Sequence, residues 1–131
     1  MSRILIVDDD DDLVQILMIS LKSMGHELAS AGDPASGLQV ARGFRPEMIL
    51  LDYHMPGATG AHLFEAFRRN AATAQTPILF MSGEATPAQI FGEVADSNLS
   101  RFISKPVSLA DLKRLIDEML AGAGRTPPPA A

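Results

Sequence analysis

Polar side chains that can hold a cation or a phosphoryl group come directly after the apolar runs of this sequence. Asp8 and Asp9 follow one run, and Asp52 follows another. Ser82 and Lys105 stand at the ends of two later runs. Carboxylates, a hydroxyl and an ammonium are the groups that proteins place around a metal ion and a phosphoryl group. Their order along the chain therefore predicts phosphoryl chemistry, provided that the fold brings them together.

The apolar runs have the length and composition of buried strands. They are short, mostly continuous and rich in aliphatic or aromatic residues, which is typical of strands buried on both faces. In chain order they cover residues 4–7, 26–30 (the weakest of the five), 48–51, 78–81 and 101–103.

Segments with helical spacing alternate with these strands. The first has its apolar face at Leu13, Ile16, Leu17, Leu21 and Met24, before Gly25 ends it. In the second, Asp33 is the expected N-cap and Pro34 the first helical residue, with an end near Gly43. The remaining helices are expected around residues 63–67, from Pro87 through 94, and over 109–120 with Ser108 as its cap.

Alternating strands and helices predict an α/β fold with a mostly parallel sheet and helices on both faces. Ligands of such sheets gather at the carboxyl ends of the strands, so the polar side chains should meet at one edge. Three carboxylates within a few Å cannot all stay ionised without a cation. Oxygen ligands favour a hard ion, and Mg²⁺ fits best because it also accepts water and phosphate oxygens. An aspartate there can serve as a nucleophile toward phosphorus.

Structural roles compete with these functional ones at several positions. For Asp10, Asp11 and Asp12 we prefer a role at the start of a helix, where acidic residues are favoured. Ser82, taken alone, is as well explained by a turn. His54 is a candidate base, but we expect its side chain to face solvent at the rim of the pocket. His26 and His62 are expected at the surface.

The composition fits a single soluble domain. The chain has 131 residues, of which 47% are hydrophobic, and a formal net charge of −5. Without a cluster of lysine and arginine, no direct nucleic-acid binding is expected. The absence of cysteine excludes disulfides and thiolate metal sites. No apolar stretch approaches the ~18 residues of a membrane span, so we expect a cytoplasmic protein without membrane contact.

Four motifs together resemble the receiver domain of response regulators in two-component signalling, with the chemotaxis regulators as a close example. The motifs are Ile4 to Asp9, the Asp-x-x-Met-Pro-x-x-x-Gly stretch at 52–60, residues 81–85, and Lys105-Pro106. The resemblance runs from about residue 3 to about residue 121. It implies a flavodoxin-like (βα)5 fold with a five-stranded parallel sheet in the order 2-1-3-4-5. We expect a receiver domain over residues 1–121 and a flexible, proline-rich tail over 122–131.

The resemblance also implies how the pocket works. Asp52 would be the phosphoacceptor. Asp9 and Asp52 would bind Mg²⁺ directly, Asp8 would help through water, and the backbone carbonyl of His54 would complete the protein ligands. Lys105 would pair with the phosphoryl group, and its peptide bond to the following proline is expected to be cis.

Three further residues gain roles from the resemblance. Ser82 would hydrogen-bond a phosphoryl oxygen in the active state. Phe102 stands where the family has a switching aromatic, although it lacks the hydroxyl of the more common tyrosine. Glu84 and His54 occupy rim positions that tune the lifetime of the phosphorylated state.

The implied function is that of a signalling switch rather than a metabolic enzyme. The domain would take the phosphoryl group from a histidine kinase or a histidine phosphotransfer protein and would catalyse its own phosphorylation and dephosphorylation. The fourth helix, fifth strand and fifth helix would form the responsive face. A dimer that forms on phosphorylation is also expected, and the output partner is left open.

Other functional classes fit the sequence less well. An aspartate-nucleophile phosphatase of the haloacid-dehalogenase type needs an acid two residues after the nucleophile, where this chain has His54. The glycine-lysine motif of P-loop enzymes is absent. A degenerate receiver that only binds partners is disfavoured because each pocket residue is present. The chain fits a free-standing regulator, a phosphorelay shuttle or the front part of a longer protein.

Overall fold

Five parallel strands form the central sheet of the computed structural model, which describes residues 2–55, 58–83 and 99–122. The strands are β1 (Arg3–Val7), β2 (Glu27–Ala31), β3 (Met48–Asp52), β6 (Ile78–Ser82) and β7 (Ser100–Ser104). They lie in the order β2-β1-β3-β6-β7, and all four neighbouring pairs are parallel. The predicted order 2-1-3-4-5 is therefore confirmed.

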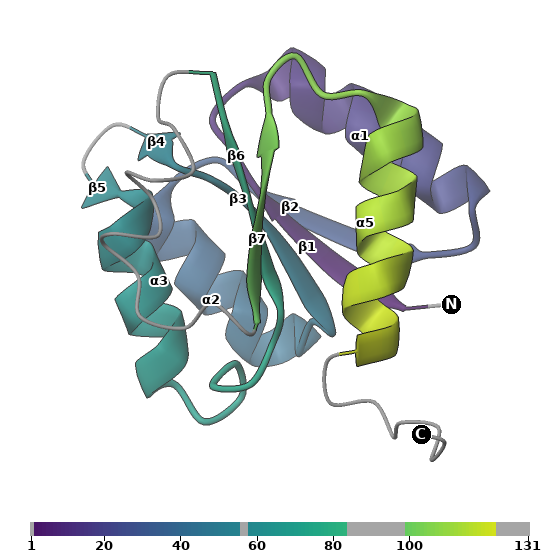
Figure 1. Cartoon of the computed structure of the whole chain (residues 1–131). Coiled ribbons are helices and arrows are strands. Elements are labelled where there is room, and N and C mark those ends of the chain that lie inside the picture. Colours follow the sequence, from purple (N-terminus) through teal and green to yellow (C-terminus); the bar gives the residue numbers. More distant parts are fainter. Residues whose placement is uncertain (1, 56–57, 84–98, 123–131) are drawn as a thin grey trace.

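Two helices cover each face of the sheet within the described part of the chain (Figure 1). One layer contains α1 (Asp11–Ser23) and α5 (Leu109–Gly122), and the other contains α2 (Pro34–Phe44) and α3 (Gly60–Arg69). The helix predicted from Pro87 through residue 94 lies outside the described residues, as do residues 123–131 of the predicted tail. Gly122, predicted as the first residue of that tail, is instead the last residue of α5. In the part of the chain that is described, no helix combines the length and apolarity needed to cross a membrane.

The two layers have separate cores because side chains alternate along each strand. Ile4 and Ile6 of β1 belong to the cluster under α1 and α5, while Leu5 and Val7 belong to the cluster under α2 and α3. The same alternation runs along β3 and β6. A strand with a core on both faces must be apolar at every position, which explains the continuous runs in the sequence.

Capping residues begin the first two helices where the sequence predicts them. The Asp10 side chain accepts a hydrogen bond from the Leu13 backbone N–H, and the Asp33 side chain accepts one from Ser36. Gly25 follows α1 with a φ of 94°, a conformation that favours glycine. These contacts confirm the predicted starts of both helices and the predicted end of the first.

A left-handed residue after α2 and a short hairpin were not predicted. The helix ends at Phe44, which confirms the predicted end near Gly43, and the left-handed residue that follows is Arg45, with a φ of 53°. The Arg3 Nε donates to the carbonyl oxygens of Phe44 and Arg45 at 3.1 Å each, so a tertiary contact fixes this turn. Where a plain loop was expected, β4 (His54–Met55) and β5 (Ala58–Thr59) pair as antiparallel strands.

The apolar face of α1 is narrower than its spacing predicts. Leu17 and Leu21 are fully buried, but Ile16 is 53% exposed and Met24 is 37% exposed. Helical spacing located the apolar residues of this helix but did not show which of them would be buried. His26 also differs, since it is half-buried and its Nδ1 accepts a hydrogen bond from the Ser2 backbone N–H. His62 is exposed, as expected.

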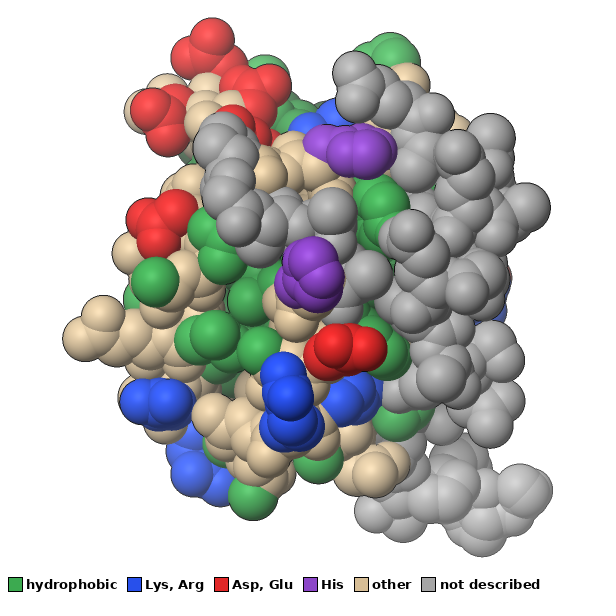
Figure 2. Space-filling view, turned by 90° about the vertical axis from the view of Figure 1, so that its left-hand side faces the viewer, with side chains coloured by type: hydrophobic (Ala, Val, Ile, Leu, Met, Phe, Trp, Pro, Cys, Tyr) green, Lys and Arg blue, Asp and Glu red, His purple; other side chains and the backbone are tan. Residues whose placement is uncertain are grey.

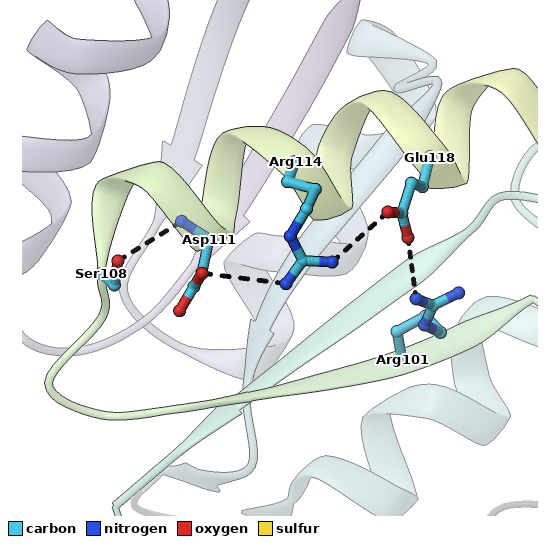
Figure 3. A network of polar contacts seen from close by, with 5 residues as sticks. All are labelled: Arg101, Ser108, Asp111, Arg114 and Glu118. Carbon is cyan, nitrogen blue, oxygen red and sulfur yellow. Dashed lines mark hydrogen bonds and ion pairs between the residues drawn. The ribbon is translucent and has the colours of Figure 1, made fainter.

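Polar contacts connect α5 to the neighbouring strand β7 (Figure 3). The Ser108 hydroxyl accepts a hydrogen bond from the Asp111 backbone N–H at 3.3 Å, which confirms the predicted cap. Glu118 pairs with Arg101 of β7 at 3.0 Å and with Arg114 of its own helix at 3.3 Å. These ion pairs are exposed, so each should add less than about 1 kcal/mol to stability.

Candidate functional site

Strand alternation places the key charged residues on the same side of the sheet edge. Ile6 and Leu50 pack in the core under α1 and α5, and the residues two positions further along are Asp8 and Asp52. Lys105 follows β7, the strand at the sheet edge, directly. The three charged side chains meet there, although 44 residues separate the two aspartates in sequence.

The ammonium of Lys105 lies between the two buried carboxylates. Its Nζ is 2.9 Å from Asp8 Oδ2 and 3.5 Å from Asp52 Oδ1. The Asp8 and Asp52 side chains are 0% and 4% exposed, whereas that of Lys105 is 23% exposed. The charge of the lysine therefore neutralises part of the buried acid while its side chain still reaches solvent.

Backbone donors orient both carboxylates. The Asp10 N–H donates to Asp8 Oδ1 at 2.9 Å, and the His54 N–H donates to Asp52 Oδ1 at 3.2 Å. Because each bond uses one oxygen of its carboxylate, the carboxylates keep further lone pairs for other partners. The turns that follow β1 and β3 thus hold the acids in fixed positions.

A third acid completes a cluster that suits a metal ion. Carboxylate oxygens of Asp8, Asp9 and Asp52 all lie within 4.8 Å of one another. Asp9 is exposed, so the cluster opens to solvent on its side. Hard oxygen ligands on a partly open site match Mg²⁺, which keeps several water molecules when it binds to proteins.

The electrostatics of the pocket favour an additional cation. Burial and the charge of Asp8 raise the pKa of Asp52 from 3.8 to about 7, despite the opposing effects of Lys105 and the His54 N–H. Burial lowers the pKa of Lys105, but its hydrogen bond to Asp8 and the charges of both acids outweigh this and raise it overall. One ammonium is not enough to keep Asp52 strongly acidic, and a divalent ion would compensate.

Ser82 ends the strand next to β3. Ser82 is buried, and Met81, the residue just before Ser82, pairs in register with Asp52. The Ser82 carbonyl accepts a hydrogen bond from the Lys105 backbone N–H at 2.9 Å, which connects the ends of β6 and β7. The predicted cis peptide between Lys105 and Pro106 is present. The structure therefore brings the predicted hydroxyl and ammonium to the same edge as the acids.

The remaining predicted residues lie at different depths. The His54 side chain is exposed, and its ring stands edge-on to Tyr53 with the ring centroids 5.2 Å apart. Phe102 is half-buried and packs against the core under α2 and α3. Glu84 lies outside the described residues, so its rim position stays a prediction.

Sequence reasoning missed a groove beside the pocket. Ile16 and Leu109 line it, and both are exposed rather than buried. Helical spacing shows which residues of α1 are apolar, but it does not show how far the neighbouring elements cover them. Only the packed structure separates the buried part of that face from the exposed part.

Comparison with known proteins gives a consistent family. The family model of the response regulator receiver domain matches residues 4–117. The DNA-binding dual master transcriptional regulator RpaA of Synechocystis is 28% identical over 129 residues, which cover 97% of this chain and 52% of RpaA. Protein PilH of Pseudomonas aeruginosa is 28% identical over 123 residues, which cover 93% of this chain and 100% of PilH. The chain thus spans about half the length of RpaA and the whole length of PilH.

Solved structures show the same fold. The chemotaxis protein CheY4 of Vibrio cholerae has a TM-score of 0.83 and 27% identity, and the match covers 91% of this chain and 98% of CheY4. The receiver domain of the sensor histidine kinase PA1611 from Pseudomonas aeruginosa, solved with magnesium in its active-site cleft, has a TM-score of 0.79 and 20% identity, covering 91% and 97% of the two chains. From the match to the family model and the topology of its sheet, this chain belongs to the response regulator receiver domain family.

Proposed function

We propose that this chain accepts a phosphoryl group on Asp52 from the phosphohistidine of a histidine kinase or a histidine phosphotransfer protein. The observation that carries the proposal is the cluster of Asp8, Asp9 and Asp52, whose oxygens lie within 4.8 Å of one another. Lys105 contacts two of the three acids. None of these residues alone would support the assignment, but together they place a nucleophile, metal ligands and a cation in one pocket.

The acid cluster is the expected holder of Mg²⁺. Asp9 and Asp52 would be direct ligands, Asp8 would act through water, and the backbone carbonyl of His54 would contribute a further oxygen. When bound, Mg²⁺ would neutralise charge on the phosphoryl oxygens and on the acids. The receiver domain of PA1611, solved with magnesium in its cleft, supports this choice by analogy of fold.

Phosphoryl transfer needs little covalent machinery beyond the nucleophile. An oxygen of Asp52 attacks phosphorus, a P–O bond forms, and the P–N bond to the donor histidine breaks. The imidazole leaves with the electron pair of that bond and takes up a proton. The Lys105 ammonium would move from the free carboxylates to the phosphoryl oxygens, and the Ser82 hydroxyl would donate to another oxygen.

The rim of the pocket would control access and lifetime. A Cβ added at Gly83 would meet the Lys105 Cβ at 3.6 Å, so glycine leaves only slightly more room than alanine would. Hydrolysis by a water passing His54 and Glu84 would reset the domain. The chain is on this proposal a signalling switch that catalyses both its phosphorylation and its dephosphorylation.

A population shift would carry the signal to the surface. A change from 1:99 to 99:1 needs about 5.5 kcal/mol of differential binding. Hydrogen bonds to a charged group contribute about 1.5–3 kcal/mol each, so the contacts of Ser82 and Lys105 together give about 3–6 kcal/mol. Both contacts would therefore be needed. Phe102 would move with Ser82. Within the described residues, β7 and α5 would form the responsive face, and any dimer that forms on phosphorylation would use this face.

The output is proposed to lie outside this chain. RpaA is named a DNA-binding regulator, and this chain spans about half of its length. The expectation that no nucleic acid is bound therefore applies only to the residues of this chain and stays a prediction. We assign the receiver domain to residues 1–121, and α5 continues one residue further, to Gly122. Any DNA-binding function would belong to another chain or to a further domain.

Labelling by acetyl phosphate tests the assignment without a partner protein. With Mg²⁺ present, the unaltered chain should gain one acid-stable, alkali-labile phosphoryl group, measured by intact mass spectrometry. Asp52→Asn should abolish the gain and Asp9→Asn should reduce it strongly, because one removes the nucleophile and the other a metal ligand. Asp11→Asn is the matched control and should label normally. Full labelling of Asp52→Asn would refute the acceptor assignment.

A further inference from the structure

Three arginines without ion pairs lie at the ends of α2 and α3. Arg42 is in the last turn of α2, Arg45 directly follows that helix, and Arg69 is in the last turn of α3. All three are exposed, and none of them forms an ion pair within the described residues. By contrast, Arg101 and Arg114 on β7 and α5 are both paired with an acid. We refer to the three unpaired residues as the arginine patch.

The arginine patch and the acceptor pocket lie at opposite ends of the sheet. The helices α2 and α3 contact each other in one layer, and both run from the carboxyl ends of the strands toward their amino ends (Figure 1). Figure 2 looks onto this layer and shows Lys and Arg side chains gathered at its lower end and most of the acidic side chains at its upper end. A partner bound at the lower end would therefore leave the acceptor edge open.

Arg45 occupies a backbone conformation that favours a different residue. Its φ of 53° lies in the left-handed region, where glycine or asparagine usually follows a helix. The turn is held by Arg3, whose Nε donates to the carbonyl oxygens of Phe44 and Arg45 at 3.1 Å each. The exposed Arg45 side chain contributes nothing to these contacts. An unfavourable conformation that packing does not explain points to a role for the side chain itself.

Helix stability accounts for only part of the arginine patch. Positive side chains are favoured in the last turn of a helix, which explains Arg42 and Arg69 as it explains Lys22 of α1. Arg68 has a clear structural role, because its Nη1 donates to a loop carbonyl at 3.0 Å. Neither explanation applies to Arg45, which stands beyond the end of its helix and has no such hydrogen bond.

The surroundings of the arginine patch favour a short acidic segment as its ligand. Unpaired guanidinium groups bind carboxylates and phosphates in a planar, two-pronged geometry. A long polyanion would also meet the acidic end of the same face, on a chain with a net charge of −5. Phe64 and Phe67 of α3 are buried, so they offer no surface for stacking bases. Phe44 is only half-buried beside Arg45 and can contact an apolar side chain.

We propose that the arginine patch docks a short acidic segment of a partner protein. Carboxylates of that segment pair with Arg42, Arg45 and Arg69, and one apolar side chain packs beside Phe44. The inference goes beyond the proposed function and does not depend on it. It gives the domain a second contact surface, at which a partner can stay bound while the acceptor pocket reacts.

The test uses the full isotope-labelled chain and two matched helical peptides. One peptide carries glutamates around a leucine on one face, and the other has glutamines in place of the glutamates. NMR titration should show the glutamate peptide shifting the resonances of residues 42–45 and 66–70. The glutamine peptide should shift them far less. Binding should weaken several-fold between low and physiological ionic strength, because salt screens exposed charges.

The variant Arg45→Gly separates binding from folding. Glycine suits the left-handed conformation, so this variant should unfold at the same temperature as the unaltered chain or at a higher one. Its affinity for the glutamate peptide should nevertheless fall about two- to fivefold. Adding Arg42→Gln and Arg69→Gln should lower the affinity about tenfold or more in total. Lys22→Gln, which removes an exposed cation from the last turn of α1 in the other layer, is the matched control and should bind normally.

Several results would overturn the proposal. They are equal binding of both peptides, no detectable binding at millimolar glutamate peptide, or unchanged binding by the triple variant. Tighter binding of a single-stranded oligonucleotide or of phosphatidylserine vesicles to the same residues would assign the patch to nucleic acid or to a membrane. Self-association in sedimentation experiments that Arg45→Gly abolishes would assign it to a second copy. Acetyl phosphate should label the triple variant at the unaltered rate, and failure of the unaltered chain to label would count against the proposed function alone.

Discussion

The charge balance around Asp52 dominates the site at the scale of single residues. Asp8 and burial disfavour the ionised carboxylate, while Lys105 and the His54 N–H favour it. The outcome is a pKa of about 7. Ionised Asp52 is therefore destabilised in the metal-free domain by burial and by repulsion from Asp8, and a bound cation would reduce both effects.

This destabilisation of the ionised carboxylate predicts a pH-dependent stability in the metal-free protein. Because the folded pKa of Asp52 lies above its usual 3.8, the folded state retains a proton that the unfolded state has lost. Stability should thus fall as pH rises from about 4 to about 7. The full shift corresponds to about 4 kcal/mol at ~1.4 kcal/mol per pH unit, and we expect about 1–3 kcal/mol because the pocket relaxes and admits water.

Asp52→Asn removes this penalty, so in EDTA it should be more stable than the unaltered chain by that amount at pH 8. The advantage should shrink by more than half at pH 5. Urea unfolding measures both differences. Equal stability of the two proteins at pH 8 would contradict the origin of the shift.

Ser82 offers a second prediction at this scale. Ser82→Ala should still be labelled by acetyl phosphate, because the nucleophile and the acid cluster are intact. Its switch should be incomplete, because a full population shift needs about 5.5 kcal/mol and only one of the two contacts that supply this energy remains. The phosphorylation-induced shift of the Phe102 ring resonances measures the response. A full shift in Ser82→Ala would argue against the proposed role of the hydroxyl.

At the scale of elements, sequence patterns predicted what depends on local rules. Continuous apolar runs located the strands, and Asp33-Pro34 located the start of α2 because capping is a local interaction. The left-handed turn at Arg45 depends on Arg3, which is 42 residues away, and no local rule could show it. In the pocket, residue types predicted which side chains meet, but the 2.9 Å contact of Lys105 with Asp8 required the packed sheet edge.

The attachment of α5 allows a matched comparison between burial and charge. Leu112→Ala should lower the free energy of unfolding by about 2–5 kcal/mol, because this side chain is fully buried in the core. Glu118→Ala removes contacts with Arg101 and Arg114 but should cost at most about 1 kcal/mol, since the pairs are exposed (Figure 3). Denaturant unfolding measures both. A larger loss for Glu118→Ala would mean that the network contributes more than exposed ion pairs usually do.

At the scale of the whole molecule, titrating groups lie at both ends of the sheet. His26 is just before β2, where its Nδ1 accepts from Ser2, far along the strands from Asp52. Burial, followed by the charge of the chain's amino terminus, lowers the pKa of His26, although Asp117 and Glu47 oppose the shift. The two ends therefore respond to pH in opposite directions.

His26 should stabilise the fold above pH 6.5 and lose this contribution as pH falls. Below its unfolded pKa the unfolded state takes up a proton before the folded state does, so acid favours unfolding. His26→Asn, which keeps an acceptor but does not titrate, should lack this dependence. Thermal unfolding of both proteins between pH 5 and 8 measures the difference. Parallel curves would show that His26 does not contribute.

The separate cores on the two faces of the sheet have a mechanical consequence. Asp52 continues the row of Met48 and Leu50 under α1 and α5, whereas Ser82 continues the row of Ile78 and Phe80 under α2 and α3. A phosphoryl group bound to Asp52 and hydrogen-bonded to Ser82 would connect the two rows across the edge of the sheet. A shift of either residue would then change the packing of both helical layers, so that one phosphorylated carboxylate would alter opposite faces of the domain.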